Sequence, residues 1–237
     1  MKRAILAAAL SIAAGSAHAQ GALLETFADV RTAPEARPSR LINPALVDIT
    51  ALLPPPKAQG ETDTCTSWAV TYAAASANLR AKHPEQPQVA LSPAFTYPLA
   101  GGSRFCRGLT SISKTLDMLR DNGALPLPNY AFDPGCCARQ PTPAENARAA
   151  AYRISGWQKL DAHDLEAVKG QLAEHRPVIF AMPVGPAFIQ HRGDGVFDRL
   201  ETGTDTTGHA MVLAGYDDAK AAYRLMNSSG RNWGDHG

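Results

Sequence analysis

The chain has 237 residues, of which 45% are hydrophobic, and a formal net charge of +1 at pH 7. So balanced a charge offers no basic surface for nucleic acid or for an anionic membrane, and we expect neither as a partner. The length and apolar content suit one larger domain, or two closely packed halves, with a substantial core.

The first 19 residues have the layout of a secretory signal peptide. Lys2 and Arg3 precede an apolar run that ends in the small-residue sequence Ala-His-Ala at 17–19. The run is too short to span a bilayer, and no later stretch reaches the roughly 20 apolar residues that a transmembrane helix needs. We therefore expect residues 1–19 to be removed, export to the periplasm or the extracellular space, and a mature charge of about −1 after the loss of two basic residues.

The next two segments lack helical character. Residues 20–45 are rich in Ala, Pro and Arg and show little periodicity, which predicts a flexible leader. Apolar residues then recur between Leu41 and Leu53, where the chain is expected to pack on other parts of the protein. Three consecutive prolines, Pro54 to Pro56, forbid a helix and predict an extended connector.

A strong helix signal begins at Cys65. The sequence CTSWAVTYAAASANL, residues 65–79, is dominated by alanine and carries larger side chains at three- and four-residue spacings, as at Trp68 and Tyr72. Small residues on most faces predict that this helix is buried in the middle of the protein. Thr64 is the predicted N-cap, with its hydroxyl accepting a backbone N–H.

Two further helices and then a sheet are predicted. The helices are expected at 111–121, ending at Asn122-Gly123, and at 163–175. The pattern then changes to short apolar or alternating runs split by Gly and Asp turns, which begin at Pro177, Gly195, His209 and Ala221. Such runs are typical of an antiparallel sheet. The fold class is therefore α+β, with a helical half and a sheet half that meet in a cleft.

The four cysteines of an exported chain ordinarily form two disulfides, but their spacing here favours one. Cys106 can bridge either member of the adjacent pair Cys136 and Cys137, and we favour Cys137. That closure would stabilise the fold by about 3 to 4 kcal/mol. Cys65 is then left as a free thiol. No second CxxC pair and no HExxH motif accompanies the doublet, so neither a metal nor another cofactor is predicted.

An unpaired cysteine in an oxidising compartment is either a buried structural thiol or a nucleophile. A thiol attacks a carbonyl as thiolate, and an ordinary pKa near 8.5 leaves only a few per cent of that form at neutral pH. The N-terminus of a helix and a neighbouring imidazole both favour the thiolate. Cys65 has the first by position, and the histidine must come from elsewhere in the fold.

His209 is the best candidate for that histidine. It follows the sequence TDTTG and begins the predicted strand HAMVLAGY, which places it at a sheet edge facing the expected cleft. The other histidines beyond the signal peptide lie in loops, beside turns, at the flanks of a helix or among the final polar residues; these are His83, His163, His175, His191 and His236.

Three ordered motifs, QGETDTCTSWA, GHAMVLAGY and NSSGRNWGDHG, resemble those of the papain-like cysteine peptidases, most closely the bacterial secreted members. Gln59 lies six residues before Cys65, as in that family. His209 begins a strand that ends in Gly-Tyr, and Asn227 opens an Asn-Ser-x-Gly-x-x-Trp-Gly segment. The resemblance covers residues 46–237. It implies the papain-like two-lobed fold, with a helical lobe at about 60–150, a β lobe at about 151–237 and the active site between them.

The resemblance also implies that the protein hydrolyses peptide bonds in a peptide or protein substrate. Cys65 would be the nucleophile, and His209 its imidazolium partner and the general acid for the leaving amine. Asn227 would orient the imidazole. The side-chain amide of Gln59 and the backbone N–H of Cys65 would form the oxyanion hole.

The sequence departs from the family pattern at three positions. Asp63 places a carboxylate near the thiolate, which would oppose its ionisation. Ser229 replaces a tryptophan that shields the bond between asparagine and histidine from water, and Thr62 replaces a cysteine of the common extra disulfide. Because of these departures, the alternative to an active peptidase is a catalytically impaired relative that binds peptides in the cleft. A third interpretation is an acyltransferase or amidase of another fold with the same three residue types.

Overall fold

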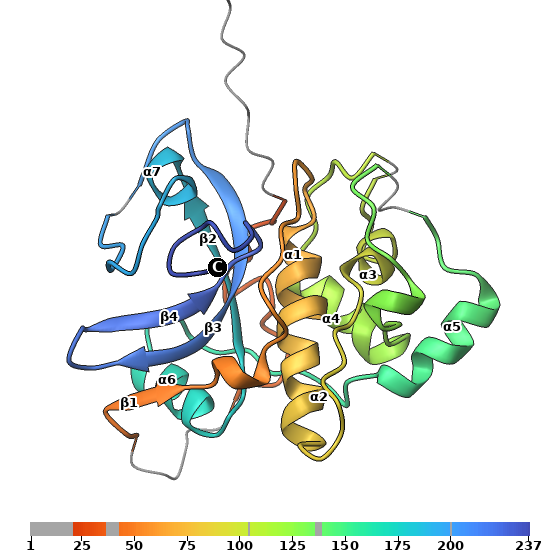
Figure 1. Ribbon diagram of the computed structural model, residues 1–237, viewed down its shortest axis with the longest axis horizontal. Coiled ribbons are helices and arrows are strands. Elements are labelled where there is room, and N and C mark those ends of the chain that lie inside the picture. Colours follow the sequence, from red (N-terminus) through yellow and green to blue (C-terminus); the bar gives the residue numbers. More distant parts are fainter. Residues whose placement is uncertain (1–20, 37–42, 104, 136–138, 200) are drawn as a thin grey trace, which may run out of the picture.

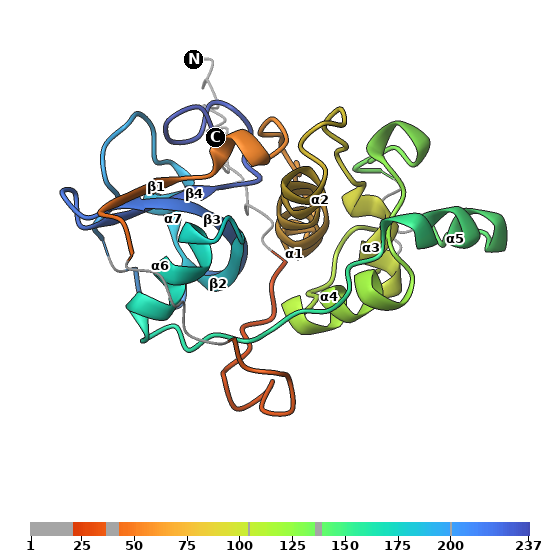
Figure 2. The same cartoon turned by 90° about the horizontal axis from the view of Figure 1, so that it is seen from below.

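The computed structural model describes residues 21–36, 43–103, 105–135, 139–199 and 201–237 (Figure 1). Most helices lie on one side of the molecule, an antiparallel sheet with shorter helices beside it lies on the other, and one long helix runs between the two sides (Figures 1 and 2). The α+β class and the two-lobed arrangement predicted from the sequence are confirmed.

The central helix is continuous from residue 65 to residue 82. It consists of α1 (Cys65–Ser67), a π-helical stretch η2 (Trp68–Ala75) and α2 (Ser76–Lys82). All residues from 65 to 77 are buried, because the alanines let both lobes approach the helix closely. The predicted helix over 65–79 and its central position are therefore confirmed.

In the helical lobe, α3 (Pro93–Leu99) and α4 (Ile112–Asp121) pack against the central helix, and α5 (Pro143–Ala149) lies farther out (Figure 2). The short 3-10 turn η3 (Leu127–Asn129) lies between α4 and α5, and η4 (Ala150–Tyr152) follows α5. Ser111 caps α4 by accepting the N–H of Lys114, so the helix begins where the sequence predicted.

The β lobe is a four-stranded antiparallel sheet in which β3 pairs with each of the other strands. Its strands are β1 (Leu46–Asp48), β2 (Val178–Val184), β3 (Thr207–Asp217) and β4 (Ala222–Met226). The helices α6 (Leu165–Ala173) and α7 (Pro186–Ile189) and the turn η1 (Thr50–Leu52) complete the described elements. β1 precedes the helical lobe in sequence but joins the sheet, and Val47 and Ile49 of this segment pack in the core that the sheet shares with the central helix.

Two local predictions are wrong. The hydroxyl of Thr64 lies 2.7 Å from that of Thr62 and makes no capping bond to the helix. Residues 195–199 form a loop rather than a strand. The ring of Phe197 packs edge-on against that of Phe188, with the ring centres 5.2 Å apart, and this tertiary contact holds the loop.

Some predictions fall on residues outside the described ranges. The signal peptide, 1–19, is one, and the doublet Cys136 and Cys137 is another. Cys65 is free, as predicted. The pairing of Cys106 stays a prediction, which non-reduced peptide mapping should decide with a fragment linking Cys106 to one member of the doublet. A bridge to Cys65 would contradict its proposed role.

Candidate active site

Cys65 is the first residue of the central helix, where unpaired backbone N–H groups favour a negative charge. Its side chain is fully buried, and its sulfur accepts a hydrogen bond from the backbone N–H of Gly21 at 3.1 Å. Burial raises the pKa of Cys65, although backbone hydrogen bonds of Ala210 and Gly21 act in the opposite direction. Burial therefore favours the protonated thiol in this state.

His209 lies in β3, opposite Met182 of β2, and is 1% exposed. Its Nε2 lies 2.7 Å from Oδ1 of Asn227, and the backbone N–H of Ser228 donates to the same oxygen at 2.7 Å. Because an amide oxygen only accepts, Nε2 carries the proton. Nδ1 is buried and has no hydrogen-bond partner within the described part of the chain. An unprotonated Nδ1 is an atom that can take a proton from a thiol.

Burial lowers the pKa of His209 to about 4, with the bond to Asn227 acting in the opposite direction. The imidazole is therefore neutral at pH 7. Because an unfolded histidine has a pKa near 6.5 and binds its proton first, the folded state should lose stability as the pH falls from about 6.5 to about 4. Thermal unfolding of the mature protein across this range should show the loss, and His209→Gln should reduce it. Equal losses in both proteins would contradict a buried neutral imidazole.

The bond between Asn227 and His209 is shielded from water, since Asn227 is only 4% exposed. Ser229 is itself exposed, in a segment whose backbone pairs with that of Ala58. The sequence predicted that a serine at 229 would leave the bond open to water. That prediction is wrong for the state described, because both partners of the bond are buried although residue 229 is a serine.

Gln59 joins the site through bonds to the residue that follows Asn227. Its backbone N–H donates to the carbonyl of Ser228 at 2.8 Å, and its Oε1 accepts the hydroxyl of Ser228 at 2.6 Å. Its side-chain amide donates to the carbonyl of Thr62 at 2.5 Å. These bonds fix the orientation of the amide and hold the segment before Cys65 against the segment after Asn227. All four predicted site residues thus lie at the junction of the two lobes.

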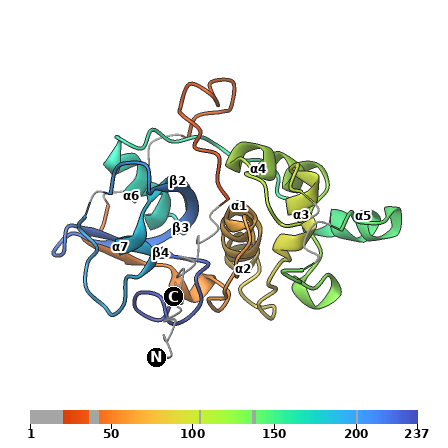
Figure 3. The ribbon, with the colours of Figure 1, turned by 90° about the horizontal axis from the view of Figure 1, so that it is seen from above.

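The leader crosses this junction, as its path between the lobes in Figures 2 and 3 shows. After Gly21, the N–H of Ala22 donates to the carbonyl of Gly208 in the β lobe at 3.2 Å. The N–H of Leu23 donates to the carbonyl of Thr110 in the helical lobe at 3.0 Å, and the N–H of Thr110 donates to Gly21 at 3.0 Å. The prediction of a flexible leader is therefore wrong for residues 21–36.

The close approach of the leader depends on two glycines. A Cβ added to Gly21 would lie 1.8 Å from the backbone oxygen of Asp63, and one added to Gly208 would lie 2.2 Å from that of Ala22. Both distances are far inside van der Waals contact. The opposing atoms belong to the backbone, so no side-chain rotation relieves the clash. A side chain at position 21 is incompatible with the leader in this position.

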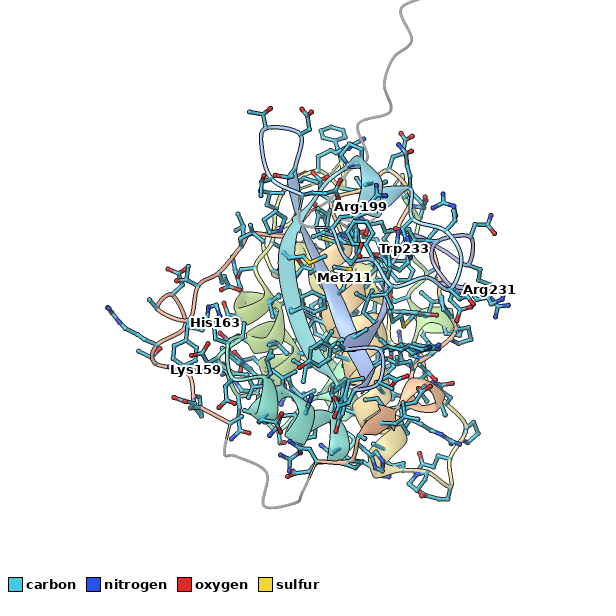
Figure 4. All side chains as sticks on the ribbon, turned by 90° about the vertical axis from the view of Figure 1, so that its left-hand side faces the viewer. Lys159, His163, Arg199, Met211, Arg231 and Trp233 are labelled. Carbon is cyan, nitrogen blue, oxygen red and sulfur yellow. The ribbon has the colours of Figure 1, made fainter. Side chains whose placement is uncertain are left out.

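Farther along, Glu25 anchors the leader at the start of α4. Its carboxylate accepts the backbone N–H of Ser113 at 3.0 Å and also the Ser113 hydroxyl, where the helix N-terminus favours a negative charge. The leader then loops outward beside Lys159 (Figure 4). The Lys159 ammonium lies 4.1 Å from the ring centre of Phe27 and donates to the carbonyl of Arg31 at 3.0 Å.

A model of the papain family of cysteine proteases matches residues 44–237. The chain belongs to this family. Its members are cysteine peptidases, and the protein is one of them. No curated protein matches the chain significantly. Among the described residues, no helix has the length and apolar character needed to cross a membrane.

Solved structures of papain-family proteases share the fold. Xylellain, a cysteine protease from Xylella fastidiosa, is 24% identical over 93% of this chain and 88% of its own, with a TM-score of 0.78. A cysteine protease of Carica candamarcensis, solved in complex with E-64, is 22% identical over 82% of this chain and 86% of its own, with a TM-score of 0.64. Digestive procathepsin L 3 of Tenebrio molitor is 18% identical over 94% of this chain and 69% of its own, with a TM-score of 0.69.

Two contributors to the papain-family site were not predicted from the sequence. Ser228 holds both Gln59 and Asn227, yet nothing but its position after Asn227 pointed to it. The leader was the other. Gly208, directly before His209, was an available signal, because a glycine in a strand often marks the close approach of another backbone.

Proposed function

We propose that Cys65 and His209 are the catalytic pair of this cysteine peptidase and that Asn227 orients the imidazole. The observation that supports the pair best is the buried bond from Nε2 to Asn227. It leaves Nδ1 as an unprotonated acceptor in the site that also holds the free thiol. A histidine with a merely structural role would be expected to have both ring nitrogens bonded when buried.

In the proposed reaction, Nδ1 of His209 takes the proton of the Cys65 thiol. The thiolate attacks the carbonyl carbon of the scissile peptide bond and forms a tetrahedral oxyanion. The imidazolium then gives its proton to the nitrogen of the leaving amine as the carbon–nitrogen bond breaks, which leaves a thioester. A water molecule then gives a proton to Nδ1 and attacks the thioester carbon. The carbon–sulfur bond breaks, the carboxylic acid is released, and the imidazolium returns its proton to the sulfur, which restores the thiol and the neutral imidazole.

Gln59 and the backbone N–H of Cys65 are the proposed donors to the oxyanion. The bonds from Gln59 to Ser228 and Thr62 support this role, because they preorganise the amide beside the N-terminus of the central helix. Gln59→Ala should therefore lower kcat about 100-fold with KM nearly unchanged, measured on a fluorogenic peptide. A rise in KM at constant kcat would instead assign Gln59 to substrate binding.

The substrates are peptides or proteins, as the family implies. The signal-peptide pattern of residues 1–19 supports export to the periplasm or the extracellular space. N-terminal sequencing of the secreted protein should give Gln20 as the first residue.

The position of the leader supports a latent form of the enzyme. With Gly21 bonded to the sulfur, the Cys65 side chain has no exposed surface, so a substrate carbonyl cannot reach it. The leader must leave the junction before the reaction proposed above can begin. Gly21→Leu should achieve this in the full mature chain, because the added side chain would collide with the backbone of Asp63.

A peptide epoxide or vinyl sulfone tests the proposed function in the Gly21→Leu protein. We expect one probe per chain, attached to Cys65. When Cys65→Ala is combined with Gly21→Leu, no probe should attach, and when His209→Ala is combined with Gly21→Leu, the probe should attach slowly. Mass spectrometry of the labelled peptide identifies the site. If iodoacetamide modifies Cys65 but the peptide probe binds without reacting, the chain is the impaired peptide binder instead.

A further inference from the structure

Asp63 lies two residues before Cys65 and contacts the loop that follows Cys106. Its backbone N–H donates to the carbonyl of Cys106 at 2.7 Å, and its Oδ2 accepts the N–H of Gly108 at 2.9 Å. Its Oδ1 lies 4.0 Å from the guanidinium of Arg107. The Asp63 side chain is only 17% exposed, so water competes weakly for the bond to Gly108.

Gly108 is held from a second side by Tyr97. The hydroxyl of this buried tyrosine donates to the carbonyl of Gly108 at 3.1 Å. Both backbone polar groups of Gly108 are thus bonded to side chains of the protein. The φ angle of Gly108 is +137°, a conformation that favours glycine. Asp63 and Tyr97 together fix the course of the loop just before Thr110.

Thr110 is the residue through which the helical lobe binds the backbone of the leader. It accepts the N–H of Leu23 and donates to the carbonyl of Gly21, each at 3.0 Å. The leader therefore bonds to the main chain of Thr110, two residues beyond Gly108, whose N–H is bonded to Asp63. A shift of this short loop would misplace both groups of Thr110 at once.

We propose that Asp63 is a positioning residue that fixes the segment Gly108–Thr110 as the edge on which peptide main chains bind, first that of the leader and then that of the substrate. The part concerning the substrate rests on the proposed peptidase function. This role replaces the sequence-based expectation that the Asp63 carboxylate acts on the thiolate. The carboxylate is bonded to the N–H of Gly108 and faces Arg107, and burial is the cause that raises the pKa of Cys65.

The first test measures how fast iodoacetamide modifies Cys65 in the full mature chain, where the leader protects the sulfur. Asp63→Ala removes the acceptor for Gly108, so the leader should bind less tightly and alkylation should be about fivefold faster or more. Asp63→Asn keeps an acceptor oxygen but removes the charge, and should stay close to the original rate. Tyr97→Phe, which removes the other bond to Gly108, should accelerate alkylation in the same direction.

The matched control is Asp217→Ala. The Asp217 carboxylate accepts a backbone N–H at 3.0 Å, from Ala219, in an exposed turn of the β lobe, so its loss should leave the rate unchanged. Equal acceleration by Asp63→Ala and Asp63→Asn would assign the effect to charge and overturn the proposal. An unchanged rate in both Asp63→Ala and Tyr97→Phe would overturn it as well.

The second test measures peptide hydrolysis in the Gly21→Leu background. Asp63→Ala should raise KM about tenfold, with kcat within about twofold, and Asp63→Asn should restore the original KM. A fall in kcat at constant KM would contradict a positioning role. If no variant hydrolyses peptides, the proposed function fails, whereas the alkylation rates still decide the role of Asp63 because they require no catalysis.

Discussion

Replacing Gly21 by leucine is expected to accelerate the alkylation of Cys65 about 100-fold. The added side chain would begin 1.8 Å from the backbone oxygen of Asp63, and the leader can avoid this contact only by leaving its position. Overpacking of this kind costs about 3 kcal/mol, which shifts the equilibrium toward the open state by about two powers of ten. The second-order rate constant with iodoacetamide, followed by mass spectrometry of the intact chain, measures the change.

Gly156→Leu is the matched control for this experiment. A Cβ added to Gly156 meets no atom within 4 Å, so the substitution should leave the alkylation rate unchanged. Peptidase activity should rise in parallel with alkylation in the Gly21 variant alone. If Cys65 reacts as slowly in Gly21→Leu as in the original protein, the leader is not what shields the sulfur.

Cys65→Ala is expected to abolish peptide hydrolysis, by a factor of about 10⁴ or more, in the Gly21→Leu background. No other group in the proposed reaction can form the thioester, and removal of a catalytic nucleophile typically has an effect of this size. The fold should tolerate the change, because the substitution removes one sulfur atom from the edge of a helix whose other contacts remain. Hydrolysis of a fluorogenic peptide and the thermal unfolding midpoint are the two measurements.

A measurement of peptide binding distinguishes loss of the nucleophile from loss of the binding site in Cys65→Ala. Cys65→Ala should retain the affinity of the open protein for a peptide ligand, because the main-chain edge proposed to bind peptides, Gly108–Thr110, does not include the sulfur. Residual hydrolysis within about tenfold of the unsubstituted background would show that another residue attacks the substrate, and the assignment of Cys65 would be wrong.

The central helix and most of the sheet could be predicted because their patterns are local. Alanine-rich spacing after Cys65 and the apolar runs at Pro177 and His209 depend on few contacts outside each segment. The strand predicted from Gly195 is absent, and Phe197 of this segment instead packs against the ring of Phe188, a contact that the alternating pattern does not indicate. The segment β1 was noted only as apolar, since three residues are too few to show a strand period.

The four proposed site residues could be found because their motifs keep a fixed order and spacing along the chain. The contacts that prepare the site could not, because each joins a backbone N–H to a side chain that is far away in the sequence. Gly21 bonds to the sulfur of a residue 44 positions away, and Asp63 bonds to the N–H of a residue 45 positions away. Neither contact needs a distinctive side-chain pattern, so the leader appeared structureless and Asp63 appeared unfavourable.

The pH dependence of Cys65 alkylation in the Gly21→Leu protein tests the assignment of Cys65 and His209 as a catalytic pair most directly. With the leader displaced, we predict a reactive thiolate well below pH 8.5, and a shift of that titration to higher pH in the additional variant His209→Ala. If Cys65 titrates near pH 8.5 like an isolated thiol, and the loss of His209 changes nothing, the two residues do not form a pair.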